Sequence, residues 1–169
     1  MNEELEQQLV EKYPGILRDW KGDPRQTCMA WGIAIGNGWY ELIDNACHDV
    51  TELIGKRDVK FIADQIKEKF GGLRFYYHLE KNQTILEWFE WKVMNPLMIN
   101  RFWKGGREYN KIKDFRKKYL FKSLREKISD IVDHAEILSY QTCEVCGQPG
   151  KRSGGGCVQT LCEKCDKQD

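Results

Sequence analysis

The chain has 169 residues, of which 41% are hydrophobic and 31% are charged, and its 27 basic and 26 acidic side chains leave a net charge of +1. This length suits one domain, or one domain with a small appendage, and allows a core that needs no disulfides. The near-neutral balance excludes a uniformly basic nucleic-acid coat, and no apolar run reaches the roughly 17 residues needed to span a bilayer. The acidic start, Met1-Asn2-Glu3-Glu4, is unlike a signal peptide, so we expect a cytoplasmic protein with no membrane partner.

Two segments in the first third of the chain predict helices. Residues 2–12 place their apolar side chains on one side, and a Pro-Gly pair follows as a stop. Over residues 39–54 the apolar positions recur every three or four residues, which is the pattern of an amphipathic helix with one buried face. Cys47 belongs to that apolar stripe, so we expect it in the core.

The next segments predict a third helix and a strand. Residues 59–70 repeat the helical spacing, and Gly71-Gly72 follows as the expected helix stop. From Leu73 to Leu79 apolar and polar residues alternate, which is typical of a half-buried strand. The positions that predict the helix are Val59, Ile62, Ala63, Ile66 and Phe70.

The remaining helical patterns lie in the second half of the chain. Residues 84–100 predict a helix that breaks near Pro96, and residues 107–139 predict another whose second half has a regular apolar stripe. The fold class we predict is therefore α+β. It consists of a mainly helical domain with a small β element over residues 1–140, which carries a basic helical insertion at about 84–127.

The cysteines indicate a metal site and not a disulfide framework. There are seven, an odd number, and no secretion signal accompanies them. Four of them form two Cys-x-x-Cys pairs separated by 15 residues. Each pair can bind an ion from a single tight turn, and two pairs complete a tetrahedral four-thiolate site of the kind that zinc fills. The predicted ligands of one structural Zn²⁺ are Cys143, Cys146, Cys162 and Cys165.

Residues 141–169 predict a zinc ribbon, in which two cysteine turns flank a short hairpin. The segment has few apolar side chains, so a metal would have to hold it together. Four cysteine ligands leave zinc no open coordination position, which predicts a structural ion. The segment is neutral before the thiolates are counted, which favours a structural or protein-docking ribbon over one that grips a nucleic-acid backbone. Cys157 is either an inward-facing apolar residue of one strand or an alternative ligand.

The charge is distributed unevenly along the chain. Residues 1–100 carry a net charge of −4, residues 101–127 a net charge of +8 and residues 128–169 a net charge of −3. The basic segment also contains six aromatic residues, and interleaved cations and rings can bind phosphates and stack on nucleobases. Three interpretations stay open: a solvated helix face that meets the acidic first half, a phosphate or nucleic-acid contact, and a surface for an acidic protein. The candidate contact residues are Lys111, Arg116, Lys117, Lys118 and Lys122.

The sequence offers little for catalysis. It has three histidines, none in a pair suited to a catalytic metal, and it lacks a Gly-rich phosphate loop and a nucleophile elbow. We therefore predict that the protein is not an enzyme. Arg74 and Tyr76 share the strand face opposite the predicted core and are candidates for clamping a nucleotide, unless helices from the second half cover that face.

Three motifs occur together: Gly38-Trp39-Tyr40 at the start of a helix, Lys69-Phe70-Gly71-Gly72-Leu73-Arg74-Phe75-Tyr76, and Ser139-Tyr140 leading into Cys143-Glu144-Val145-Cys146-Gly147. This combination resembles a group of small bacteriophage proteins without assigned function. The similarity covers residues 35–80 and 130–165, with the basic stretch as an insertion. The resemblance implies a phage accessory protein that acts in the cytoplasm of the infected bacterium, and it carries no catalytic residues to transfer.

The function we predict is stoichiometric binding to a host macromolecule, because small phage proteins of this kind often block a host process in that way. A host protein is the expected partner, and inhibition of a defence system is one such role. Two alternatives remain. One is a nucleic-acid-binding protein that uses residues 101–127, and the other is a sponge for a signalling nucleotide that uses Arg74 and Tyr76.

Overall fold

The computed structural model describes residues 1–81, 124–153 and 158–167. The predicted helix at 84–100 and the first part of the helix predicted from residue 107 lie outside the described residues, and so does most of the basic insertion. Contacts within the chain separate Lys81–Lys127 from a first compact unit, which is made of Met1–Glu80 and Ile128–Asp169.

Three α-helices lie where the apolar spacing predicts them: α1 spans Glu3–Lys12, α2 spans Tyr40–Ile54 and α6 spans Leu124–Ser139. At the start of α1 the side chain of Asn2 accepts a hydrogen bond from the backbone N–H of Leu5 at 3.0 Å. Acidic residues fill the first turn of α1, where their negative charges interact favourably with the positive end of the helix dipole. The helices predicted in the first third of the chain are thus confirmed, and so is the second half of the long predicted helix.

The prediction of a helix over 59–70 is wrong, because this segment is a strand, β1, which spans Val59–Lys69. Phe61, Ile62 and Ala63 are all buried, and successive side chains of a strand point to opposite faces. Both faces of β1 are therefore covered. A strand that is buried on both faces loses the two-residue period, and the spacing that remains then resembles that of a helix.

One edge of β1 is occupied by the segment that precedes α2. The backbone N–H of Ala34 donates to the carbonyl oxygen of Ile66 at 3.0 Å, and the N–H of Glu68 donates to that of Ala34 at 2.9 Å. A short 3-10 helix, η1 (Cys28–Trp31), comes before this segment and contacts β1, and a second, η2 (Asn37–Trp39), leads into α2. These two hydrogen bonds give backbone N–H and C=O groups of β1 a partner, whereas in a helix such groups bond to one another within the same segment.

The strand predicted from alternation is confirmed. β2 spans Gly72–Lys81 and pairs with β1 through a two-residue turn, Phe70-Gly71. Both turn residues have positive φ angles, 54° and 73°, which is the combination that a type I′ turn requires. Glycine adopts this region freely, whereas the side chain of Phe70 opposes it. The glycines expected to stop a helix therefore close a hairpin.

Helix α6 covers the other edge of the hairpin. The backbone N–H of Leu73 donates to Ser139 Oγ at 2.8 Å, and the N–H of Phe75 donates to Glu136 Oε1 at 2.9 Å. Because the two amides are two residues apart on β2, they point to the same edge of the strand. Side chains of α6 thus accept hydrogen bonds from backbone N–H groups at this edge of β2, which would otherwise be free to pair with a strand of another chain.

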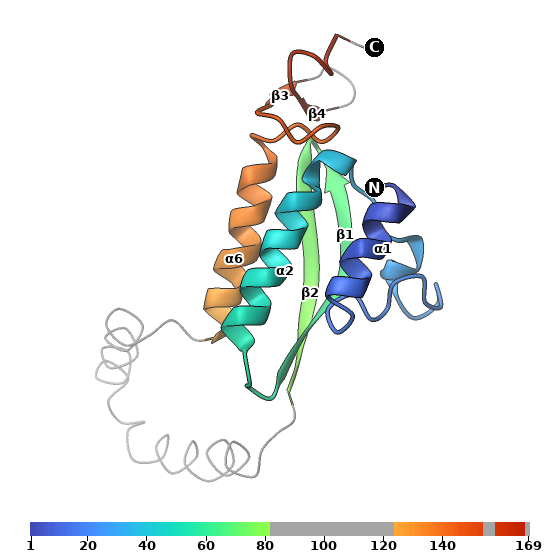
Figure 1. The fold of residues 1–169 in the computed structure, drawn as a ribbon, viewed down its shortest axis with the longest axis vertical. Helices are drawn as coiled ribbons and strands as arrows, with labels where there is room; N and C mark the ends of the chain where they lie inside the picture. The colour runs from blue at the N-terminus through green and yellow to red at the C-terminus, as the bar shows by residue number, and fades with distance from the viewer. Residues whose placement is uncertain (82–123, 154–157, 168–169) are drawn as a thin grey trace, which may run out of the picture. The chain divides into compact units, whose positions relative to one another are not determined.

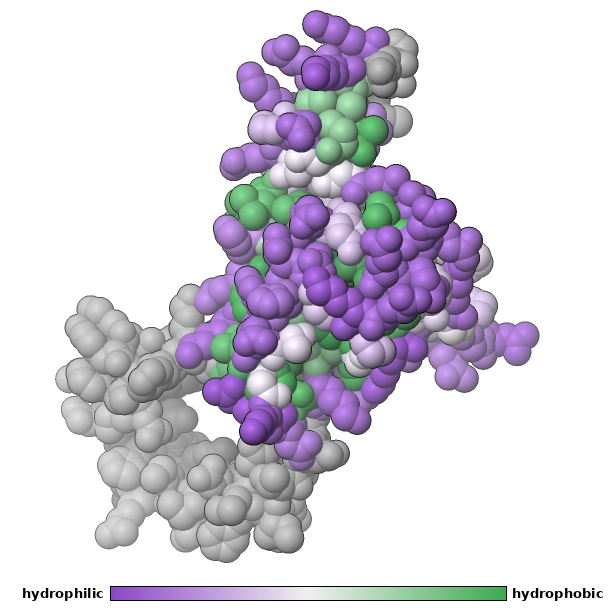
Figure 2. All heavy atoms as spheres, in the orientation of Figure 1, coloured by the Kyte–Doolittle hydropathy of each residue, from purple (hydrophilic) through white to green (hydrophobic). Residues whose placement is uncertain are grey.

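The hairpin and the helices meet around one core. In Figure 1, α2 and α6 run side by side in opposite directions, and the start of α2, the β1–β2 turn and the end of α6 lie at the same end of the unit. The face drawn in Figure 2 is mostly hydrophilic, with smaller hydrophobic areas. In the part of the chain that the structure describes, no helix is long and apolar enough to cross a membrane. The most deeply buried side chains include Trp39, Ile43, Ile62, Ile66, Leu73, Ile128 and, as predicted, Cys47.

The hairpin turn makes Phe70→Asn a stabilising substitution. It replaces a side chain that is 63% exposed with a residue that tolerates positive φ, and Asn-Gly is a preferred pair for this turn. We expect the free energy of unfolding to rise by about 1 kcal/mol. Urea denaturation of both proteins under identical metal conditions measures this, and a fall in stability would contradict it.

Candidate metal centre

The C-terminal segment, residues 140–167, follows α6 directly and is built around a short hairpin. β3 (Lys151–Ser153) pairs antiparallel with β4 (Gln159–Leu161). One cysteine turn, at 143–147, precedes β3, and a second, at 162–166, follows β4. Because the strands are neighbours and run in opposite directions, the two turns meet at one end of this hairpin.

The two cysteine turns share one type of backbone hydrogen bond. The N–H of Gly147 donates to the carbonyl oxygen of Cys143 at 2.9 Å, and the N–H of Asp166 donates to that of Cys162 at 2.9 Å. Each hydrogen bond closes a turn of five residues that begins at the first cysteine of a pair. The turn brings both cysteines of that pair to one side, which is why the two-residue spacing suits a single ion.

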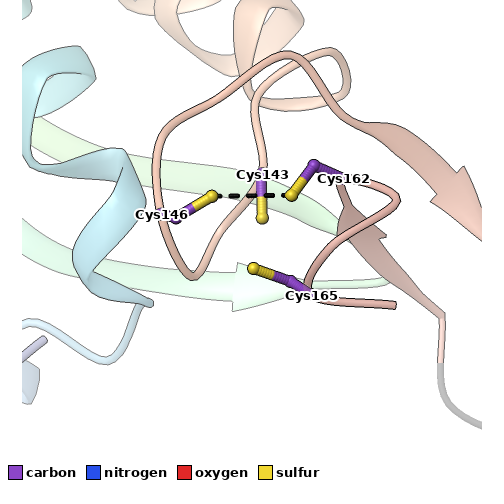
Figure 3. Close-up of side chains that lie close together, drawn as sticks. All are labelled: Cys143, Cys146, Cys162 and Cys165. Carbon is purple, nitrogen blue, oxygen red and sulfur yellow. Dashed lines mark hydrogen bonds between the residues drawn. The ribbon is translucent and has the colours of Figure 1, made fainter. Parts of the chain in front are cut away.

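The four predicted ligands are brought together. Their Sγ atoms all lie within 4.8 Å of one another. Figure 3 shows the side chains pointing toward a common centre, two from each turn, and the sulfurs of Cys146 and Cys162 are 3.6 Å apart. The cluster is positioned to hold a metal ion. Its members are Cys143, Cys146, Cys162 and Cys165.

The other cysteines do not join this cluster in the described residues. Cys47 is fully buried in α2, and burial raises the pKa of its thiol, so it remains an inert apolar side chain. Cys28 is exposed at the start of η1. Cys157 lies outside the described residues, and its two interpretations stay open.

Backbone N–H groups lower the pKa of two ligands. The pKa of Cys162 falls to about 6, chiefly because the N–H of Cys165 donates to its sulfur. At Cys143 burial raises the pKa, but backbone N–H groups of the two turns outweigh burial, and the pKa is lowered. A lowered pKa shifts each thiol toward the thiolate, which is the form that binds a metal.

The remaining two ligands hold their protons more tightly. The pKa of Cys165 is raised to about 12, mainly through its hydrogen bond with the Cys162 sulfur, and the pKa of Cys146 is also raised although the N–H of Gln148 opposes the change. Four sulfurs this close cannot all be anions without a cation between them. A bound divalent ion would supply that charge and displace the protons, and its four thiolate ligands would leave no coordination position for substrate or water.

The first cysteine turn is held against the start of α2. The N–H of Gly38 donates to the carbonyl oxygen of Glu144 at 2.8 Å, and the indole N–H of the fully buried Trp39 donates to that of Thr142 at 2.7 Å. A Cβ atom at Gly38 would collide with the backbone of the cysteine turn. Glycine is therefore required where the two backbones meet.

The second hairpin is held against the β1–β2 turn. The buried hydroxyl of Thr160 donates to the carbonyl oxygen of Gly71 at 2.6 Å. Beside it, the ring of Tyr140 occupies the space that a side chain at Gly72 would need. The C-terminal segment thus contacts both the helix start and the hairpin turn that lie at this end of the core.

The two candidate ligand-binding residues of β2 lie in different environments. The guanidinium of Arg74 donates to the Tyr140 hydroxyl at 2.7 Å and lies 3.4 Å from the carboxylate of Glu136. Side chains of α6 and of the residue after it therefore engage Arg74, in line with the interpretation that later helices cover this face. Tyr76 is 45% exposed, with Lys67 Nζ 5.4 Å from its ring centroid.

The remaining predicted contact residues lie outside the described part of the chain: Lys111, Arg116, Lys117, Lys118 and Lys122. Gly38 and Trp39 stand out in the sequence only within a motif at a helix start, and Thr160 does not stand out at all, but in the structure all three residues anchor the C-terminal segment. A glycine directly before a tryptophan at a helix start was an available signal, because close backbone contact demands glycine. For Thr160 the sequence offers no comparable signal.

No protein-family model matches the chain, and neither the curated proteins nor the solved structures give a match. The α+β arrangement and the cysteine cluster therefore stand on the geometry of this chain alone. Any function must be inferred from its residues.

Gly38→Ala tests the docking of the first cysteine turn. The added methyl group collides with backbone atoms, so we expect the free energy of unfolding to fall by about 2 kcal/mol or more. The matched control is Gly15→Ala, because nothing lies within 4 Å of a Cβ at that position. Denaturant unfolding of the metal-loaded proteins compares them, and equal stability of both variants would refute the close approach.

Proposed function

We propose that residues 141–169 form a zinc ribbon whose metal is structural. The observation that supports this most is the convergence of four thiols from two matching turns, with an antiparallel hairpin between them. Zinc accepts four thiolates in a tetrahedron without a competing geometric preference, whereas calcium and magnesium prefer oxygen ligands. The donor set therefore favours zinc.

The metal would contribute directly to folding. The buried cluster of the C-terminal segment consists of Cys143, Leu161 and Cys162, with Cys165 packed against it. Three of these four residues are proposed ligands. Because so small a cluster cannot fix a fold, the free energy of metal binding is also free energy of folding for this segment.

Removing one ligand tests the ribbon. We expect elemental analysis to give one zinc per chain for the wild-type protein and for Cys28→Ser, whose thiol lies outside the cluster, and almost none for Cys143→Ser. In Cys143→Ser, amide hydrogen exchange should accelerate in the peptides that contain Gly38 and Thr160, because the segment no longer docks. A wild-type protein that is metal-free yet equally protected there would refute the proposal.

We further propose that the protein is a phage accessory protein that binds a macromolecule of the host cytoplasm without catalysis. A four-thiolate site offers no open position for chemistry, which supports a binding role. The resemblance to small phage proteins supports the setting, and inhibition of a host defence enzyme fits that setting. The contact surface in this proposal is the basic segment, residues 101–127, whose net charge of +8 suits an acidic partner.

Charge reversal tests the contact surface. The triple variant Arg116→Glu, Lys117→Glu and Lys118→Glu should lose a partner that the wild-type protein retains in an affinity pull-down from bacterial lysate, while its melting temperature stays unchanged. The control reverses Arg25, Lys56 and Lys60, which are exposed and change the net charge equally. Nuclease treatment distinguishes the partners, because a protein partner survives it. Equal retention by both triple variants would refute this surface.

A further inference from the structure

A strip of alternating basic and aromatic side chains runs along the turn end of the β1–β2 hairpin and onto the C-terminal segment. Each basic side chain lies over the ring of an aromatic neighbour. We call this surface the basic–aromatic strip. Its members are Lys67, Tyr76, Arg74, Tyr140 and Arg152, together with Phe70 of the adjoining hairpin turn.

The first half of the strip lies on the hairpin. Lys67 Nζ is 5.4 Å from the ring centroid of Tyr76. Arg74 is two residues from Tyr76 on β2, so both side chains project from the same face of the strand. The Arg74 guanidinium then reaches the hydroxyl of Tyr140, which lies just beyond the end of α6.

The second half crosses onto β3. The guanidinium of Arg152 lies 5.4 Å from the ring centroid of Tyr140, and that of Arg74 lies 5.8 Å from the same centroid. The side chain of Arg152 also passes 3.3 Å from the place where a Cβ of Gly71 would stand, and Gly71 is the residue that follows Phe70 in the hairpin turn. The strip is therefore continuous only while the C-terminal segment is docked on the hairpin turn.

The strip is locally positive on a part of the chain that is negative. The described residues carry 17 basic and 21 acidic side chains. Of the acidic residues near the strip, Glu136 is 3.4 Å from Arg74, and Glu68 accepts a hydrogen bond from the N–H of Gly71 at 2.6 Å. Arg152 is exposed and forms no ion pair with an acidic side chain of the described residues, so its charge remains available to a ligand.

The aromatic ring at the end of the strip is presented by a strained turn. Phe70 has a φ of 54°, which costs free energy for a bulky side chain, and 63% of the residue is exposed. Because the ring is mostly exposed, its burial in the core does not offset the free-energy cost of the strained backbone. Lys69 Nζ lies 5.4 Å from the same ring and places a further cation beside it. A strained backbone that displays an aromatic ring to solvent is typical of a contact site.

We propose that the basic–aromatic strip binds single-stranded nucleic acid. Lys67 and Arg152 pair with phosphates, and the rings of Tyr76 and Phe70 stack on bases. Stacking selects single strands, because the faces of bases in a duplex are already covered by their neighbours. This inference goes beyond the proposed function, since it concerns another surface than residues 101–127, and it needs only the docked C-terminal segment.

Fluorescence anisotropy with a labelled oligothymidylate of about 16 nucleotides tests the binding. The zinc-loaded full chain should bind at about 50 mM salt and lose affinity as salt rises to about 200 mM. It should bind a duplex of the same length at least about fivefold more weakly, because stacking is lost. No binding at low salt, or equal affinity for the duplex, overturns the proposal.

Phe70→Asn separates binding from folding. It should lower the affinity for the oligothymidylate by about fivefold or more while the protein remains at least as stable as the wild type. The control is Trp31→Asn, which removes a ring that is 79% exposed but does not belong to the strip. Wild-type affinity in Phe70→Asn, or the same loss in Trp31→Asn, overturns the role of the Phe70 ring.

Reversing two cations locates the phosphate contacts. Lys67→Glu with Arg152→Glu should lower the affinity by about tenfold or more and flatten its salt dependence. The matched control, Lys56→Glu with Lys60→Glu, changes the net charge equally at the other end of the hairpin. Equal losses in both double variants show an effect of net charge and overturn the strip as the site.

The basic segment is the competing location for nucleic acid. The triple variant at Arg116, Lys117 and Lys118 should keep its affinity for the oligothymidylate if the strip is the site. If that variant loses binding and the strip variants keep it, the strip proposal is wrong. The zinc ribbon and the contact surface at residues 101–127 would then still stand.

Discussion

The contact between the cysteine turns and the end of the core is the constraint on which the rest of the unit depends. The C-terminal segment buries few side chains of its own, so its shape depends on the hydrogen bonds that join it to Gly38 and Gly71. In the proposed zinc ribbon, a metal ion between the cysteine turns would act together with these bonds. Glu144 can accept the Gly38 N–H only while Cys143 and Cys146 stay in one tight turn. With the proposed metal ion bound, turn formation and docking would be one cooperative event, and the site would be structural for the whole unit.

Parts of all three motifs singled out in the sequence meet at this junction. Gly38 lets the first cysteine turn approach, Gly72 leaves room for the Tyr140 ring, and Arg74 joins that ring from the strand. Much of a pattern that resembles a binding motif in the sequence is thus explained by packing between segments far apart in the chain. Packing does not explain Phe70, since its exposed ring sits on a backbone that glycine or asparagine would adopt more easily. Packing therefore leaves the exposed Phe70 ring, on the surface beside the junction, without a structural reason.

Elements with one buried face could be predicted from the sequence, and elements with two could not. Helix α2 buries a single stripe and β2 alternates, so each shows its own period. Strand β1 is covered on both faces, and its apolar residues therefore imitate a helix. The cysteine cluster was predictable because each pair is local. The residues that anchor the cysteine turns could not be predicted in the same way. Trp39 and Thr142 are 103 residues apart, and the spacing of residues in a sequence does not indicate which distant backbone segments come into contact.

The described residues include more acidic than basic side chains, so the proposed binding of a nucleic acid has to overcome an unfavourable net charge. The proposed zinc ion with its four thiolates would contribute −2, and this charge would lie in the same segment as Arg152. Exposed charges further apart than about 8 Å are largely screened at physiological salt, whereas strip cations would touch phosphates directly. The negative net charge of the described residues therefore weakens the long-range attraction of a nucleic acid, but it does not weaken the direct contacts between strip cations and phosphates. Binding must therefore draw on stacking as well as on charge, and this requirement is met by a flexible single strand and not by a duplex.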